Sequence, residues 1–360
     1  METTRAPMHW WTTTEKSILV TTLGIIIVFG VCGNLLVIIA ILRFKRLRRA
    51  VNSYLILNLA VSDFLTASIL MPFHLATVLD LNIIVDNGFL CKIGGILSYP
   101  FYICSTITLV MLAIERHIAV SDPLRYISRV TTRTIAIMIV YCWTQGVIFV
   151  VLVSSMANIE FSTQSLDCGV AWAGTPLWLS ILALLLNIVL PFFLLLIMSL
   201  RVLIVAIRQK KRIDTERFRI DRTQRKKSAY YLYLLAGLEG KATVAVLVVI
   251  FVFLILWIPF LITRGFMAFT QLYISPIVTT SVVWLLHLNS VVNVFIYTVR
   301  RSDYRHAFVS IIRCTSLSRS ADIERTITTM HEAGSREKNM NHSSGTIQLN
   351  CTVITIPDVT

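Results

Sequence analysis

The chain has 360 residues, of which 56% are hydrophobic and only 14% are charged, and its mean hydropathy is +0.75. A water-soluble domain needs a charged surface, so this composition excludes an ordinary soluble globular protein. The net charge is +14, but the basic residues are distributed between apolar runs along the whole chain. This distribution argues against nucleic acid as a partner and points to a membrane protein.

A polar segment, residues 1–17, comes first and contains no cleavable signal peptide, so we expect the first apolar segment to insert by itself. Seven apolar segments follow, each long enough to cross the roughly 30 Å hydrocarbon core as a helix. Their predicted spans are 18–42, 53–79, 89–114, 135–156, 176–200, 243–263 and 277–299. The third and fifth are expected to continue beyond the membrane. The sequence therefore predicts an all-α, seven-transmembrane helix bundle over residues 18–299.

The segment after the last span alternates basic and apolar residues at helical spacing over residues 300–314. This pattern predicts a short amphipathic eighth helix in the membrane interface. Cys314, at its end, is a candidate for palmitoylation. Residues 315–360 are rich in Ser, Thr and Asn, which predicts a disordered tail.

The distribution of Lys and Arg predicts the orientation of the chain. Basic residues crowd the first, second and third loops on one side, at 43–49, 125–133 and 208–241. The other side holds only four, which are Arg5, Lys16, Lys92 and Arg264. By the positive-inside rule the N-terminus lies outside and the tail is cytoplasmic, in a multi-pass protein of the plasma membrane. The basic loops then meet anionic lipid headgroups.

Two of the seven cysteines are expected to face the oxidising outside. Cys91 lies at the outer end of the third span, and Cys168 lies in the second outer loop. These two can form one disulfide.

Polar residues inside the spans carry the functional signal, because a charge at mid-membrane costs roughly 2.5–3.5 kcal/mol or more. Asp63 lies midway along the second span. Hydroxyl and amide side chains lie at a similar depth, namely Asn34, Ser105, Asn289, Ser290 and Asn293. Such oxygens can surround a small hard cation, or they can form a hydrogen-bonded network that joins helices. His74 and His287 can likewise pair across helices or simply pack.

One motif from each span resembles the rhodopsin-like, class A family of G-protein-coupled receptors. The motifs are Gly33-Asn34, LAVSD (59–63), Glu115-Arg116, Trp143, Pro191, LWIPF (256–260) and NSVVNVFIY (289–297). The resemblance covers residues 18–314 and implies a receptor that activates heterotrimeric G proteins and binds arrestin. It is either a divergent amine-receptor-like member or an orphan-type receptor that is constitutively active without a diffusible agonist.

The resemblance implies a switch centred on Arg116. In the family this Arg is held by the neighbouring acid, here Glu115, and by a second acid at the base of helix six, where Glu239 stands. A guanidinium suits this role because it bonds carboxylates with two hydrogen bonds. Movement of helix six frees the Arg toward the G protein. Other implied switch residues are Trp257, Asn293 and Tyr297.

The resemblance also implies a Cys91–Cys168 bridge and a site for an allosteric sodium ion. The sodium ligands would be Asp63, Ser105, Asn289, Ser290 and Asn293. No other cofactor is implied. Val294 and Ser199 depart from the family pattern, which has Pro and Tyr there, and this puts the usual inner water network in doubt.

The implied ligand pocket lies between helices three, five, six and seven. Its lining is Ser98, Tyr99, Tyr102, Asn187, Trp257, Phe260, Leu261, Arg264, Trp284 and His287, with His74 nearby. Span 277–299 has no Lys for a retinal Schiff base, which excludes an opsin. Ser98 replaces the Asp that pairs with amines, and Arg264 favours anions. We therefore expect a small acidic or neutral ligand.

Other classes of protein fit the sequence less well. An odd number of spans without internal repeats disfavours a transporter or channel. No nucleophile–base set or metal-spaced cluster lies within the spans, so an enzyme is not expected.

Overall fold

The computed structural model describes residues 11–79, 88–162, 166–171, 174–219, 244, 246–263 and 274–313. The chain divides into two compact units, Met1–Val309 and Ser310–Thr360, and the helix bundle lies in the first. Within the described residues, seven helices are long and apolar enough to cross a membrane. This confirms the predicted seven-transmembrane bundle.

Four of the seven spans are single α-helices, and two contain a short π-helical segment. The single helices are α1 (Thr13–Arg43), α6 (Gly88–Ser121), α8 (Thr132–Met156) and α12 (Pro276–Arg300). The second span is α3 (Ser53–Leu65), η1 (Thr66–Leu70) and α4 (Met71–Val78). The fifth is α9 (Leu177–Leu184), η3 (Leu185–Val189) and α10 (Leu190–Arg219). The sixth is the helical span Val246–Thr263.

Short elements connect or follow the spans. They are α2 (Lys45–Arg48), α7 (Pro123–Arg129), β1 (Ile159–Ser162), β2 (Asp167–Val170) and α13 (Ser302–Ile312). The amphipathic α13 confirms the predicted eighth helix. The all-α prediction missed the antiparallel hairpin β1–β2, in which Phe161 pairs with Cys168.

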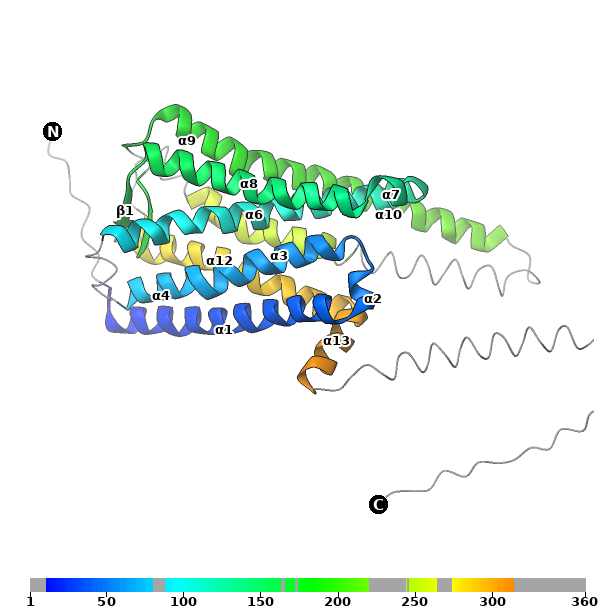
Figure 1. Ribbon diagram of the computed structural model, residues 1–360, viewed down its shortest axis with the longest axis horizontal. Coiled ribbons are helices and arrows are strands. Elements are labelled where there is room, and N and C mark those ends of the chain that lie inside the picture. Colours follow the sequence, from blue (N-terminus) through cyan, green and yellow to red (C-terminus); the bar gives the residue numbers. More distant parts are fainter. Residues whose placement is uncertain are drawn as a thin grey trace, which may run out of the picture. The chain divides into compact units, whose positions relative to one another are not determined.

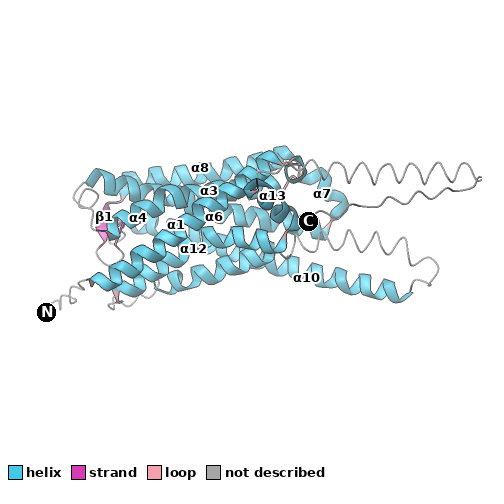
Figure 2. Cartoon of the chain, turned by 90° about the horizontal axis from the view of Figure 1, so that it is seen from below, coloured by secondary structure: helices cyan, strands magenta, loops and turns pink. Residues whose placement is uncertain are grey.

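The long helices run side by side, with the hairpin at one end of the bundle and α7 at the other (Figures 1 and 2). We call the first the disulfide end, because Cys168 of β2 is bonded there to Cys91 of α6. We call the second the Arg116 end. The hairpin packs directly on α6, since a Cβ placed on Gly95 would lie 2.6 Å from Ile159 and 3.1 Å from the carbonyl oxygen of Cys168.

The first helix begins earlier than hydropathy predicts. Thr12 caps it by accepting a hydrogen bond from the Glu15 backbone, and the Glu15 carboxylate accepts one from the Thr12 backbone in return. This capping box satisfies two backbone N–H groups that a helix start leaves unpaired. The helix therefore starts at Thr13, five residues before the apolar run at 18.

A proline follows each π-helical segment by two residues. Pro72 comes after η1, and Pro191 comes after η3. Proline has no N–H for the carbonyl four residues earlier, so the hydrogen-bond ladder cannot continue in its ordinary register. A π segment is one way to absorb this interruption. Two polar residues of the predicted sites lie close by: Asp63 is three residues before η1, and Asn187 lies within η3.

Helix α6 is the structural centre of the bundle, because it packs against α3, α8 and α10. Its approach to α8 is close: a Cβ on Gly146 would lie 3.0 Å from the Cα of Pro100. By contrast, α8 and the fifth span expose large apolar side chains, which include Ile137, Val140, Val147, Val151 and Phe193. Such surfaces are stable against lipid tails rather than water.

Candidate functional site

The Arg116 end holds a buried ion pair. Arg116 donates from Nε to Oε2 of Glu115 at 2.6 Å and from Nη2 to Oε1 at 2.5 Å. The Glu115 side chain is completely buried and Arg116 is 8% exposed. Adjacent helical residues normally point apart, so the guanidinium must fold back onto its neighbour to make both bonds. An acid and a base side by side at the end of an apolar helix thus neutralise each other.

A third side chain belongs to this pair. The Tyr126 hydroxyl, on α7, donates to Oε1 of Glu115 at 2.5 Å. Burial, together with the charge of Glu115, raises the pKa of Tyr126, so the phenol keeps its proton and remains a donor. Tyr126 could not be predicted from the sequence, because α7 lies in the loop segment after the Glu115-Arg116 motif, where residue spacing does not predict a contact.

The buried carboxylate of Asp63 joins three helices. Its Oδ1 accepts from the hydroxyls of Ser105 at 3.2 Å and Ser290 at 3.1 Å, and its Oδ2 accepts from the Asn293 amide at 2.8 Å. Asn289, which precedes Ser290 in the sequence, is also buried, but no hydrogen bond joins it to Asp63. Asn34 donates to the Ser290 carbonyl at 2.9 Å and connects α1 to the same region.

The donor atoms of the Asp63 cluster are oxygens, which suit a small hard cation. Within the described residues, no group of three or more His, Cys, Asp or Glu side chains is arranged to hold a metal ion. A small cation would therefore use the carboxylate with the hydroxyl oxygens of Ser105 and Ser290. These hydroxyls can rotate to present lone pairs to a cation instead of protons to Asp63.

The disulfide end contains a chain of polar side chains from three helices. His74 Nδ1 lies 2.8 Å from His287 Nε2, and His287 Nδ1 lies 3.0 Å from the Tyr102 hydroxyl. His74 and His287 are buried. Each contact needs one proton, so the chain has two consistent directions, with Tyr102 as either the first donor or the last acceptor. Of the two alternatives that the sequence left open for these histidines, pairing across helices and simple packing, the structure contains the pairing.

Trp257 adjoins this chain and has aromatic neighbours on several sides. Its ring meets Tyr102 edge-on at 6.5 Å between centroids and also contacts Phe260 at 6.0 Å. Its indole N–H is buried and has no hydrogen-bond partner among the described residues. Asn187 donates to the Ala183 carbonyl, while its Oδ1 is buried without a partner.

The other predicted pocket residues are not all brought together. Tyr99 packs against Phe149 with tilted rings, 5.4 Å between centroids, in the cluster between α6 and α8. Trp284 packs with Leu23 and Met71, toward α1 and the second span. Ser98 donates to the Gly95 carbonyl at 2.7 Å, and Leu261 is half-buried. Tyr102, Trp257, His74 and His287 form one connected set, and Phe260 joins it through Trp257 while also packing against the cluster that contains Trp284.

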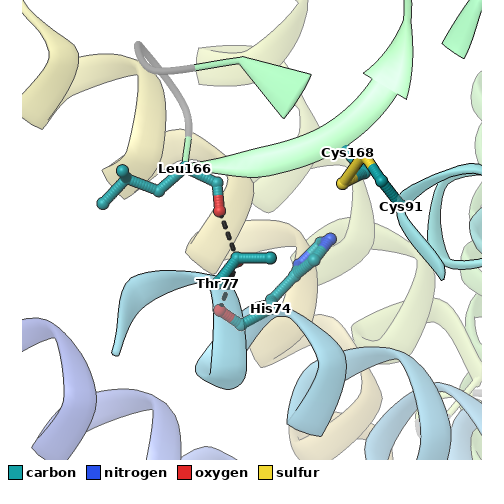
Figure 3. Close-up of a disulfide and its surroundings, with 5 residues drawn as sticks. All are labelled: His74, Thr77, Cys91, Leu166 and Cys168. Carbon is teal, nitrogen blue, oxygen red and sulfur yellow. Dashed lines mark hydrogen bonds between the residues drawn. A yellow bond between two sulfur atoms is a disulfide. The ribbon is translucent and has the colours of Figure 1, made fainter. Parts of the chain in front are cut away.

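The hairpin lies over this polar chain. Thr77 donates to the carbonyl oxygens of His74 at 2.7 Å and of Leu166 at 2.5 Å. Figure 3 shows Thr77 between these carbonyls, with the Cys91–Cys168 disulfide beside them. The structure therefore contains the disulfide that the sequence predicted. This bond fixes the hairpin to α6, and the hydrogen bond from Thr77 to Leu166 connects it to α4.

Three predicted residues, Glu239, Arg264 and Cys314, lie outside the described residues. Of the remaining switch residues, Asn293 bonds Asp63, and Tyr297 stacks on Tyr304 of α13 at 5.8 Å between ring centroids.

Comparison with known proteins identifies the family. The model for the 7 transmembrane receptor (rhodopsin family) matches residues 33–297. The chain is 29% identical to trace amine-associated receptor 4 of Rattus norvegicus over 80% of its length and 83% of that receptor. It is 29% identical to trace amine-associated receptor 9 of Homo sapiens over 78% and 80% of the two chains. This chain belongs to the rhodopsin family of seven-transmembrane receptors and is therefore a receptor rather than an enzyme.

Proposed function

We propose that this receptor activates heterotrimeric G proteins by releasing Arg116 from Glu115. The observation that carries the proposal is the buried, doubly bonded pair at the end of α6, which Tyr126 completes. Such a pair is held in one arrangement and costs free energy to open. Breaking it yields an extended guanidinium that can bond acceptors on a partner protein.

The proposed resting state includes Glu239 as a second acid that holds Arg116 from helix six. Outward movement of helix six separates Glu239 from Arg116 and shifts the population toward the active arrangement. We call the Glu115–Arg116 pair with Tyr126 the latch. Trp257, Asn293 and Tyr297 are the proposed relay between the ligand and the latch. A sodium ion at Asp63, Ser105, Asn289, Ser290 and Asn293 would favour the resting arrangement, because it binds oxygens of three helices at once.

The proposed ligand is a small molecule rather than none. Two polar atoms in the predicted pocket, Asn187 Oδ1 and Trp257 Nε1, are buried without partners in the described part of the chain. Buried polar groups of this kind are rare in proteins and call for an explanation. A ligand that donates a hydrogen bond to Asn187 Oδ1 and presents an acceptor or an aromatic face to the Trp257 N–H supplies one, which disfavours a purely ligand-independent receptor.

The ligand class we propose is an amine, contrary to the expectation from Ser98 and Arg264 of an acidic or neutral ligand. The relatives named above are trace amine-associated receptors and align with about four fifths of this chain. The aromatic side chains of Tyr102, Trp257 and Phe260 offer faces that attract a cation and pack against an aromatic body.

The proposed topology has the disulfide end outside and the Arg116 end in the cytoplasm of a plasma-membrane protein. The basic loops support this orientation through the positive-inside rule. The tail, residues 315–360, is the proposed arrestin-binding segment, and Cys314 is the proposed palmitoylation site. Basic residues of α13 would lie against anionic lipid.

The test is a cell assay of cAMP, calcium and inhibitory G-protein signalling with panels of amines, acids and alcohols. Wild type should signal in at least one readout, and Arg116→Ala should remove the signal at matched surface density. Arg125→Ala is the control, because Arg125 is exposed on α7 and pairs only weakly, at 3.6 Å from Asp122. Equal signalling by wild type and Arg116→Ala would reject the proposal.

A further inference from the structure

The chain has Ser98 at the position where an Asp would pair with an amine, so an amine ligand needs its counter-ion elsewhere. An ammonium group that leaves water for a partly closed pocket loses several kcal/mol unless a charge and acceptors replace the water. Hydroxyls such as that of Ser98 cannot supply the charge. The counter-ion must therefore be a carboxylate that another element places near Ser98.

Strand β2 carries a carboxylate at this end of the bundle, that of Asp167. Asp167 is the first residue of β2 and is half-buried. Both of its chain neighbours are fixed: the Leu166 carbonyl accepts from Thr77 of α4, and Cys168 is bonded to Cys91 of α6. The backbone of Asp167 is therefore held between helices two and three, as the positions of Leu166 and Cys168 in Figure 3 show.

The position of β2 along α6 is also defined. The Cys168 carbonyl touches Gly95, and Ser98 donates to the carbonyl of Gly95 one turn further along. Residues three, four and seven apart share a helix face, so Gly95, Ser98 and Tyr102 form one line down α6. The hairpin thus sits one turn from Ser98, at the head of the line that leads to Tyr102.

The segment that carries Asp167 lies beside the polar chain, because Thr77 donates to the carbonyl oxygens of both His74 and Leu166, the residue before Asp167. A carboxylate at this place attracts a cation and repels an anionic ligand. An acidic ligand of the kind expected from the sequence would meet this repulsion.

We propose that Asp167, on the hairpin rather than on helix three, is the counter-ion for the ammonium group of a primary or secondary amine. The proposal rests on the proposed receptor function and adds its anchoring residue. The ammonium lies between the Asp167 carboxylate and the Tyr102 hydroxyl oxygen. Tyr102 then donates to His287 Nδ1, and His287 donates from Nε2 to His74, which is one of the two consistent directions of that chain.

The amine thereby couples to the receptor interior. By choosing the direction of the Tyr102–His287–His74 chain, it fixes side chains of α6, α12 and α4 in one hydrogen-bonded arrangement. Tyr102 contacts Trp257 edge-on, so a change at its hydroxyl reaches the sixth span directly. A neutral isostere of the amine can fill the same volume but has no charge to pair with Asp167.

The test compares 2-phenylethylamine, and a panel of related primary arylalkylamines, with 2-phenylethanol and 3-phenylpropanoic acid. Signalling is measured for wild type, Asp167→Asn and the control Glu160→Gln, all at matched surface density. Glu160 lies on β1 of the same hairpin and is exposed. We expect amine potency to fall by about 30-fold or more in Asp167→Asn and to stay at the wild-type value in Glu160→Gln.

A rescue variant sharpens the test. Ser98→Asp, introduced into Asp167→Asn, returns a carboxylate one turn along α6 and should recover at least part of the amine potency. Asp167→Ser serves as a second variant if Asp167→Asn does not reach the surface. Ligand-induced thermal stabilisation of the purified receptor provides a readout that does not require coupling.

The outcomes separate this inference from the proposed function. Amine potency within about threefold of wild type in the Asp167 variants overturns the inference, as does activation by the alcohol or the acid but not by any amine. Either result leaves the proposed function intact if wild type still signals through Arg116. Loss of Arg116 dependence, in contrast, rejects the proposed function whatever the Asp167 variants do.

Discussion

The role of Tyr126 can be tested by removing one atom. Tyr126→Phe deletes the hydroxyl that donates to Glu115 and leaves the ring in place. A hydrogen bond to a charged group contributes roughly 1.5–3 kcal/mol, so its loss should weaken the hold on Glu115 and Arg116. Basal nucleotide exchange on the G protein should rise by about fivefold for a latch shift of about 1 kcal/mol.

The matched control for that change is Tyr141→Phe. Tyr141 is 54% exposed on α8, away from the ion pair, so removal of its hydroxyl should leave basal exchange at the wild-type rate. A basal rate in Tyr126→Phe no higher than in Tyr141→Phe would remove Tyr126 from the latch.

The histidine pair predicts non-additive stability. His287 contacts two side-chain partners, His74 and Tyr102, so His287→Leu should lower the melting temperature more than His74→Leu does. Residues in one hydrogen-bond network typically couple by about 0.5–3 kcal/mol. The double variant should therefore lose less than the two single losses added together. Additive losses in a double-mutant cycle would show that the 2.8 Å contact contributes nothing.

Single residues were predictable from sequence where a helix sets their spacing. Hydrogen bonds join Asp63 to Ser105 and Ser290, which the sequence placed at a similar depth because apolar spans fix the depth of each residue in the membrane. Tyr126 and Asp167 were not foreseen, because both lie in loop segments whose path depends on tertiary contacts. The expectation of an acidic or neutral ligand used the helices alone, which display Ser98, whereas the proposed counter-ion Asp167 lies on the hairpin.

At the scale of elements, the hairpin should be sensitive to its contact with α6. Gly95→Ala would place a Cβ 2.6 Å from Ile159 and 3.1 Å from the Cys168 carbonyl, which must shift β1 and β2 away from α6. We expect amine potency to fall by about tenfold, as misplacement of a charged group by about 1 Å weakens binding markedly.

Gly24→Ala is the control for that change, because no atom lies within 4 Å of the added Cβ. Alanine is also the better helix former, so this control should be at least as stable as wild type. Equal potency of the two alanine variants would show that the hairpin position does not matter for the ligand.

The disulfide predicts equivalent single variants. Cys91→Ala and Cys168→Ala each remove the same bond, whose loss typically costs about 2–5 kcal/mol. Surface expression should therefore fall to the same level in each, and the double variant should be no worse than either. One single variant with normal expression would contradict the pairing.

The elements themselves were predictable only in part. Hydropathy located seven spans because a membrane requires about 20 apolar residues per helix. It placed the start of α1 too late, since a polar capping box begins that helix. It could not predict η1 and η3, whose cause is the register change before Pro72 and Pro191. The hairpin is short and held by contacts with α4 and α6 rather than by its own pattern.

At the scale of the whole molecule, α6 connects the two ends. One continuous helix carries Cys91, Tyr102, Ser105 and Arg116, so it meets the hairpin, the polar chain, the Asp63 cluster and the latch in turn. A ligand can shift the latch only through a difference in its affinity for the two arrangements. Helix α6 is the continuous structural connection through which ligand binding at one end can affect the latch at the other.

The most direct measurement of the central claim is nucleotide exchange by purified G protein with the receptor in lipid nanodiscs. Wild type, Glu115→Gln and the double variant Glu115→Gln/Arg116→Ala are compared without ligand. We predict faster exchange for Glu115→Gln than for wild type, because the carboxylate no longer holds the guanidinium. We also predict background exchange for the double variant. Fast exchange that persists in the double variant would contradict the claim that Arg116 carries the signal.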